Sequence, residues 1–414
     1  MSIKALSLIS SVALLFACQS KSIIDHQSAP PPSAQEFSAL DCPSPATNSF
    51  DSLPIVTTLP NPFLMADGRV AADQQDWACR RQSIRQQAFH YLYGEKPPKP
   101  DVSGTVTPDA VNVSASVDGK TISFSAAVKL PDGDGPFPAF IGMGSGFAEL
   151  PEPFQALLLS KGIAVVIYDL YEIGAERQGP GHGLFYDLYG ADHPAGLLTA
   201  WAWGVSRLID VMEINGAVLD PLTVGVSGCS RFGKAALIAG AFDDRMALTV
   251  PNETGMGGLA SLKMAPVIEP EGEPVRNIVQ YEPWFSTQNF SPFIDETEKL
   301  PLDTHEVAGL IAPRGLVVLD NPYIEHLVPK SGYGAAMATR EIYKALGAEE
   351  AFSYLGNVED GNHCHWKPEF VNPLSRNLDK FLLKLDDVET GEIDALPEGM
   401  VDMAPWIKWA TPEF

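Results

Sequence analysis

The stretch "VGVSGCSRFGKAALIAG", from Val224 to Gly240, decides the fold of this chain. It opens with apolar, β-branched residues typical of a buried strand and closes with small residues typical of a helix. Between them lies a turn that carries Ser230, with Gly228 before it and Gly233 after it. Strand, tight turn and helix form a nucleophile elbow, which raises a serine hydroxyl above a sheet. The helix start offers backbone N–H groups to a developing oxyanion.

The spacing of the glycines around Ser230 is not enough by itself to identify a nucleophile elbow. The usual elbow reads G-x-S-x-G, and here the second glycine comes one residue later. A serine in such a turn is also an ordinary helix cap. Two other segments favour the elbow: "VPNETGMGG" places Glu253 at the end of an apolar run, and "DGNHCHW" places His363 and His365 in a later loop. Serine, glutamate, histidine is the chain order of α/β-hydrolase triads, in which the carboxylate orients the histidine.

Two cysteines adjoin these residues. Cys229 precedes Ser230, and Cys364 follows His363. A disulfide requires α-carbons within about 7 Å of each other. A serine and its general base must also lie within hydrogen-bond reach. The disulfide and the triad therefore predict each other, and the pairing favours His363 over His365 as the base.

A metal site is the alternative for "HCHW", because histidine and cysteine side chains bind zinc and copper. The sequence has no second cluster of cysteine and histidine to complete such a site. We therefore expect no metal and no cofactor.

The rest of the chain predicts an α/β-hydrolase fold with a mainly parallel sheet between helices. Apolar runs that read as buried strands alternate with helical segments, a pattern typical of parallel sheets. A hairpin is expected over residues 112–131, with Asp118-Gly119 as its turn. We expect strands within 137–143, 162–170, 222–228, 246–253, 315–322 and 350–357, helices within 77–93, 197–214, 234–240 and 335–347, and one catalytic domain over residues 49–414.

The N-terminus predicts export. Residues 1–17 hold a lysine and a short apolar run, which together indicate a signal peptide and not a membrane-spanning helix. "LFAC" at 15–18 resembles a bacterial lipobox, which implies acylation of Cys18, and Gln19 after it favours the outer membrane of a Gram-negative bacterium. Secretion or a periplasmic location without lipid is the alternative. Residues 18–48, rich in serine and proline, read as a flexible tether.

The cysteine count and the net charge set limits. With Cys18 acylated, four of the five cysteines remain, an even number that allows three pairings in an oxidising compartment. The net charge of −24 argues against nucleic acid and anionic membrane surfaces as partners. We expect a monomer that touches the membrane only through its lipid.

Several segments together resemble the glucuronoyl esterases of carbohydrate esterase family fifteen. They include "WACRRQSIRQQAFHYLYGEKPP", "GCSRFGKAA", "VPNETGMGG", "LDNP" and "NHCHW". The resemblance implies hydrolysis of the ester between 4-O-methyl-D-glucuronoyl side chains of glucuronoxylan and lignin alcohols. Alternatives are an esterase of the same fold for other carbohydrate esters, such as acetyl groups, and a surface protein that only binds polysaccharide.

The resemblance also implies roles for individual residues. Ser230 is the expected nucleophile, His363 the base and Glu253 the acid, while Arg231 would support the oxyanion and Lys234 would hold sugar hydroxyls. A second group is expected to shape the sugar site and the N-terminal region: Gln280 and Glu282 as sugar ligands, His326 where the family usually has a stacking tryptophan, Glu325 and Asp320 as alternative acids, and Cys42–Cys79 as a second disulfide.

Overall fold

The computed structural model describes residues 42–43, 45, 47–144, 150–178, 181–280, 282 and 285–414. The chain divides into two units, Met1–Pro32 and Ser33–Phe414, and the second contains every described residue. The expected signal peptide, Cys18 and the tether up to residue 41 lie outside the described residues. Within the described part of the chain, no helix is both long and apolar enough to cross a bilayer.

A ten-stranded sheet with the order β1-β2-β3-β5-β4-β6-β7-β8-β9-β10 forms the centre of the second unit. The first three strands pair antiparallel, as do β3 and β5, whereas every pair from β5 to β10 is parallel. The strands are β1 Asp101–Val106, β2 Ala110–Val117, β3 Lys120–Lys129, β4 Phe137–Met143, β5 Ala164–Tyr168, β6 Leu219–Cys229, β7 Met246–Asn252, β8 Gly315–Leu319, β9 Phe352–Gly356 and β10 Ile393–Ala395. This mainly parallel sheet confirms the predicted fold class.

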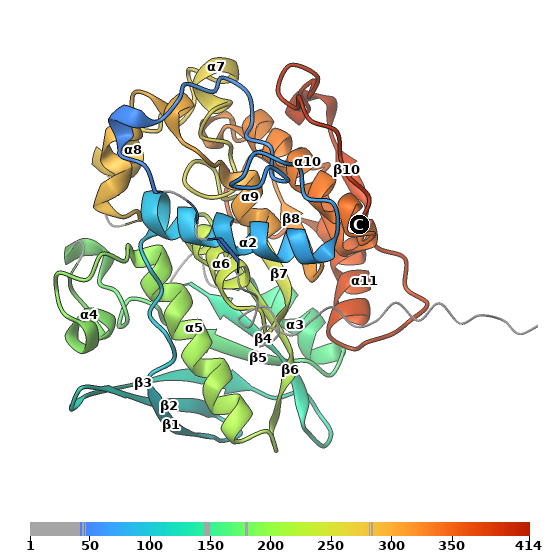
Figure 1. Cartoon of the computed structure of the whole chain (residues 1–414). Helices are drawn as coiled ribbons and strands as arrows, with labels where there is room; N and C mark the ends of the chain where they lie inside the picture. The colour runs from blue at the N-terminus through green and yellow to red at the C-terminus, as the bar shows by residue number, and fades with distance from the viewer. Residues whose placement is uncertain are drawn as a thin grey trace, which may run out of the picture. The chain divides into compact units, whose positions relative to one another are not determined.

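Helices cover both faces of the sheet, as Figure 1 shows. They are α2 Gln74–Ala88, α3 Glu152–Ser160, α4 Leu184–Tyr189, α5 Leu197–Ile214, α6 Arg231–Phe242, α7 Ala265–Ile268, α8 Asn277–Gln280, α9 Thr304–Gly309, α10 Pro329–Ala345 and α11 Val371–Phe381. One apolar cluster joins α5 and α6 to strand residues such as Val224 and Val226. A second joins α3 and α11 to Leu248 and Val250. Strand residues that are apolar on both faces are what a doubly covered parallel sheet requires.

The two outermost strands of the sheet were not expected from the sequence. β1 alternates exposed with half-buried residues, and β10 has only three residues. Neither contains the continuous apolar run of a buried strand, because edge strands have less of their surface covered. The predicted hairpin is confirmed, with Asp118 and Gly119 in the left-handed region between β2 and β3.

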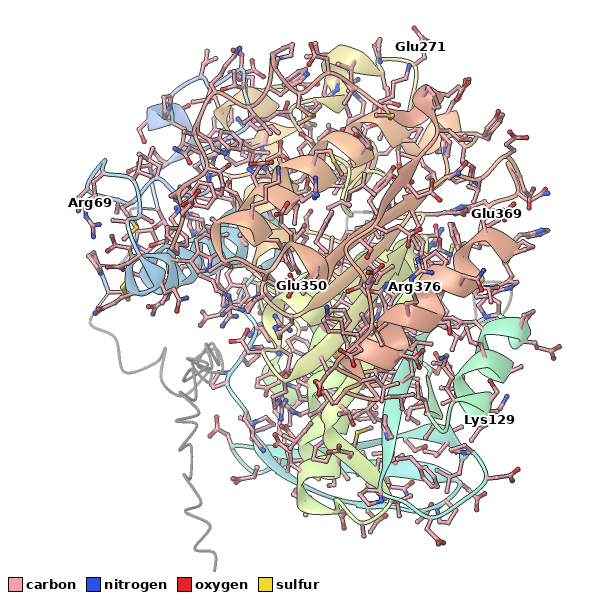
Figure 2. All side chains as sticks on the ribbon, turned by 90° about the vertical axis from the view of Figure 1, so that its right-hand side faces the viewer. Arg69, Lys129, Glu271, Glu350, Glu369 and Arg376 are labelled. Atoms are coloured by element: carbon pink, nitrogen blue, oxygen red, sulfur yellow. A yellow bond between two sulfur atoms is a disulfide. The ribbon has the colours of Figure 1, made fainter. Side chains whose placement is uncertain are left out.

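Two of the three arginines of α2, Arg80 and Arg81, are buried. Arg80 lies 2.5 Å from Glu306, and Arg81 pairs with Asp244. A buried guanidinium requires such a partner, since an unpaired charge in the interior is costly. Charged side chains that do reach solvent, such as Glu271 and Glu369, project outward in Figure 2.

A disulfide attaches the start of the described chain to α2. Cys42 and Cys79 are bonded, with their α-carbons 5.2 Å apart. The Tyr91 hydroxyl donates to the Asn48 carbonyl at 2.9 Å. The pairing implied by the resemblance is thus present, and it links the segment around Cys42 covalently to α2.

Candidate active site

Ser230 occupies a tight turn between β6 and α6. Its backbone has φ 59° and ψ −129°, a left-handed conformation that is uncommon outside glycine. The Ser230 N–H donates to the Asn252 carbonyl at 2.9 Å, which ties the turn to the end of β7. Strain of this kind persists only where surrounding contacts impose it, and it is frequent at active sites.

The two glycines around Ser230 are required by close backbone contacts. A Cβ at Gly228 would lie 2.5 Å from the Phe232 carbonyl oxygen, and a Cβ at Gly233 would lie 2.6 Å from the Asn252 oxygen. The longer spacing on the far side is therefore still compatible with an elbow, because Gly233 allows the start of α6 to pack closely against the end of β7.

Glu253 and His363 meet beside this turn. The fully buried Glu253 carboxylate lies 2.8 Å from Nδ1 of His363 through Oε2. The same oxygen accepts the Cys364 N–H at 2.6 Å. Because one side of the imidazole faces this carboxylate, Nε2 is the nitrogen left for proton transfer.

The disulfide predicted beside these residues is present. Cys229 and Cys364 are bonded, and their α-carbons are 5.7 Å apart. The residues that immediately follow Cys229 and precede Cys364 are Ser230 and His363. Two loops separated by more than a hundred positions are thereby held at one site.

The other residues considered for these roles have different partners or are exposed. The Asp320 carboxyl accepts the Tyr354 hydroxyl at 3.1 Å, and burial raises its pKa to about 7. Glu325 is exposed in a short 3₁₀ turn, and His365 is exposed beyond the disulfide. Glu253 is the acid of these three that contacts His363.

Four groups at this site could in principle surround a metal ion. Ligand atoms of Cys229, Glu253, His363 and Cys364 all lie within 4.8 Å of one another. The two sulfurs are joined in the disulfide and so offer no thiolate, which is the form that binds metals. The chemistry of this donor set therefore does not fit zinc or copper.

Two cations lie in the first turn of α6, directly after Ser230. Arg231 forms an ion pair with Glu176 and remains partly exposed. Lys234 is buried, and its Nζ lies 3.5 Å from the Glu282 carboxylate and 4.7 Å from the centroid of the Phe285 ring. Burial raises the pKa of Glu282, although the nearby lysine opposes this shift. The structure thus brings together Lys234 and Glu282, two of the residues predicted to bind sugar.

The other expected sugar ligands are exposed. Gln280 ends α8, and His326 lies in the turn Glu325–Leu327, where its carbonyl accepts the Glu273 N–H at 2.9 Å. Sequence reasoning missed Asn321, whose Nδ2 contacts Glu253 at 3.2 Å. Asn321 is the second residue after β8, and that place just beyond a strand end was the available signal.

A serine elbow at the carboxyl end of a parallel sheet, with a histidine held by a buried carboxylate, defines the class of protein. It is an α/β-hydrolase whose chemistry is the hydrolysis of carboxylic esters. Comparison with known proteins identifies the family within this class.

A family model described as "Glucuronyl esterase, fungi" matches residues 113–347. The chain is 38% identical to the 4-O-methyl-glucuronoyl methylesterase of Podospora anserina, over 89% of this chain and 77% of that protein. It is also similar to two solved structures. The glucuronoyl esterase catalytic domain from Hypocrea jecorina has a TM-score of 0.79 and 32% identity, over 87% of this chain and 98% of the other.

The second structure is a serine-to-alanine variant of the glucuronoyl esterase from Sporotrichum thermophile, in complex with methyl 4-O-methyl-β-D-glucopyranuronate. Its TM-score is 0.78 and its identity 35%, over 88% of this chain and 96% of the other. This chain belongs to the glucuronoyl esterase family.

Proposed function

We propose that this chain hydrolyses the ester between 4-O-methyl-D-glucuronoyl side chains of glucuronoxylan and lignin alcohols. One observation carries the proposal. His363 lies 2.8 Å from Glu253, and the next residue, Cys364, forms a disulfide with Cys229, the residue before Ser230. The complex of the Sporotrichum thermophile relative with a methyl 4-O-methyl-glucuronate ester supports the uronate as the acyl group.

In the first step the Ser230 hydroxyl oxygen attacks the uronoyl carbonyl. His363 takes the hydroxyl proton on Nε2, and Glu253 stabilises the resulting imidazolium. The tetrahedral intermediate then collapses, the ester C–O bond breaks, and His363 returns the proton to the departing alcohol. The uronoyl group is left esterified to Ser230.

In the second step a water molecule replaces the alcohol. His363 removes its proton, the hydroxyl adds to the acyl carbon, and Ser230 leaves with the proton from the imidazolium. The products are a free uronate and the resting enzyme, so no cofactor is needed to balance the reaction.

The oxyanion of both intermediates would be stabilised by the start of α6. The first N–H groups of a helix have no partner within it. One well-placed donor contributes about 3 kcal/mol to the transition state. Arg231 adds a positive charge there, reduced by its ion pair with Glu176. The sugar is proposed to be held by Lys234, Glu282, Gln280 and His326. Lys234 would bind a sugar hydroxyl beside Glu282.

We further propose that residues 49–414 form the catalytic domain and that the chain is exported and anchored by lipid on Cys18, in the outer membrane of a Gram-negative bacterium. The export part agrees with the two disulfides, which persist in oxidising compartments. The anchor rests on the sequence around Cys18 alone, since the matched family model and the curated relative reported above are fungal. Labelling with a radioactive fatty acid tests it: the wild type should take up label and Cys18→Ser should not.

Ester hydrolysis tests the activity. Purified protein that lacks residues 1–41 should hydrolyse benzyl D-glucuronate with a far higher kcat/KM than an aryl acetate. Ser230→Ala should lower turnover by about 10³-fold or more. Glu253→Ala should impair catalysis much more than Asp320→Ala or Glu325→Ala. Preference for the acetate would instead identify an esterase for other carbohydrate esters.

A further inference from the structure

The Glu253 carboxylate has partners on both of its oxygens. Oε2 accepts from His363 Nδ1 and from the Cys364 N–H, at 2.8 and 2.6 Å. Oε1 accepts from Nδ2 of Asn321 at 3.2 Å. Asn321 is 1% exposed and Glu253 is 0% exposed, so this contact is shielded from bulk solvent.

The orientation of the Asn321 amide is determined by its neighbours. Its Nδ2 also donates to the Asp360 carbonyl at 2.7 Å, and its Oδ1 accepts the Tyr323 N–H at 3.1 Å. A flipped amide would set an oxygen against both a carboxylate and a carbonyl, so only one orientation fits. Asn321 thus links the end of β8 both to Glu253 and to the start of the loop that carries His363.

That loop, residues 360–367, is closed by a buried lysine. Lys367 Nζ lies 2.8 Å from the Asp360 carboxylate and 2.6 Å from the Asn362 carbonyl. These bonds hold the loop together but run within it. Its attachments to the strand ends include the disulfide of Cys364, the contacts of Glu253 and the bond from Asn321 to Asp360.

We propose that Asn321 is a positioning residue for the histidine of the triad. Its amide holds Oε1 of Glu253, which leaves Oε2 aimed at His363 Nδ1, and it holds the Asp360 end of the histidine loop. Both contacts keep Nε2 of His363 directed at Ser230. The expected effect of Asn321 on ester hydrolysis rests on the proposed function. Its expected effect on the position of His363 does not.

Two substitutions test this role. Asn321→Ala removes the donor contacts to Glu253 and to Asp360. We expect kcat on benzyl D-glucuronate to fall on the order of 10-fold to 100-fold, with KM little changed, because small misplacements of a catalytic group have large effects. Asn321→Asp keeps the shape but sets a second carboxylate against Glu253. Two buried carboxyl groups in contact share a proton, so the imidazole then titrates together with this pair and the acid limb of kcat/KM should move by about one pH unit.

Asn377→Ala is the matched control. Asn377 is also 1% exposed and donates to a backbone carbonyl, that of Pro373, at 2.9 Å, but it lies in α11. It should lose comparable stability with unchanged kcat and pH profile. The titration of the His363 ring, followed by NMR without substrate, provides a second readout for all three variants.

Wild-type kcat and an unshifted His363 titration in Asn321→Ala would overturn the proposal. If that variant does not fold, Asn321→Asp decides: an unmoved acid limb and an unmoved His363 titration would also overturn it. If the wild type fails to hydrolyse the glucuronate ester, the proposed function fails, and the NMR titration still tests the role of Asn321 on its own.

Discussion

Replacing Cys229 and Cys364 together by alanine should weaken both the fold and the reaction. The disulfide joins positions 135 residues apart. In the chain-entropy view, removing the link from a loop of this length lowers the free energy of unfolding by about 5 kcal/mol. The disulfide of Cys42 and Cys79 spans 37 residues, for which the same relation gives about 4 kcal/mol.

The two disulfides therefore form a matched pair. Their loops do not overlap, and the predicted losses of stability differ by only about 1 kcal/mol. Only the bond between Cys229 and Cys364 adjoins Ser230 and His363. Its removal should lower kcat by on the order of 10-fold or more, because the histidine loop loses an attachment to the elbow. Removal of the other disulfide should leave kcat unchanged.

The assay combines unfolding and kinetics. Guanidinium titrations followed by tryptophan fluorescence give the free energies of unfolding, and initial rates on benzyl D-glucuronate are taken at a temperature where both variants are folded. The reasoning is refuted if the variant lacking Cys229 and Cys364 keeps wild-type kcat while folded. It is also refuted if the variant lacking Cys42 and Cys79 loses as much activity.

Two further substitutions test the surroundings of the site. Burial raises the pKa of Asp320 to about 7, so the stability that its protonated form contributes is complete below about pH 4 and is lost as the pH rises through 7. In denaturant titrations, Asp320→Asn should therefore reduce the difference in unfolding free energy between pH 5 and pH 8 by about 3 kcal/mol. An unchanged difference would contradict the raised pKa. Gly233→Ala should lower the free energy of unfolding by about 1–3 kcal/mol and should also lower kcat. The reason is that its Cβ would lie 2.6 Å from the Asn252 oxygen. Gly216→Ala is the control, because its Cβ would have its nearest neighbour at 3.7 Å, and it should be neutral in both assays.

The sequence by itself determined the local elements and their chemistry. Apolar β-branched runs predicted the central strands, because a strand covered on both faces needs them throughout. The turn around Ser230 and the hairpin at Asp118 were readable because glycines and neighbouring residues specify turns locally. Cysteines adjoining Ser230 and His363 carried information about distant contacts, since a disulfide requires proximity.

Only the tertiary structure decided which acid contacts His363. Glu253 and Asp320 each come directly after one of two neighbouring parallel strands, β7 and β8, so both were eligible from the sequence. The structure directs Glu253 at His363, 110 positions away, and turns Asp320 toward Tyr354. The ion pair of Arg231 with Glu176 was equally hidden. Such choices depend on which side chains the strand order brings into contact, and a pattern of neighbours along the chain does not contain that order.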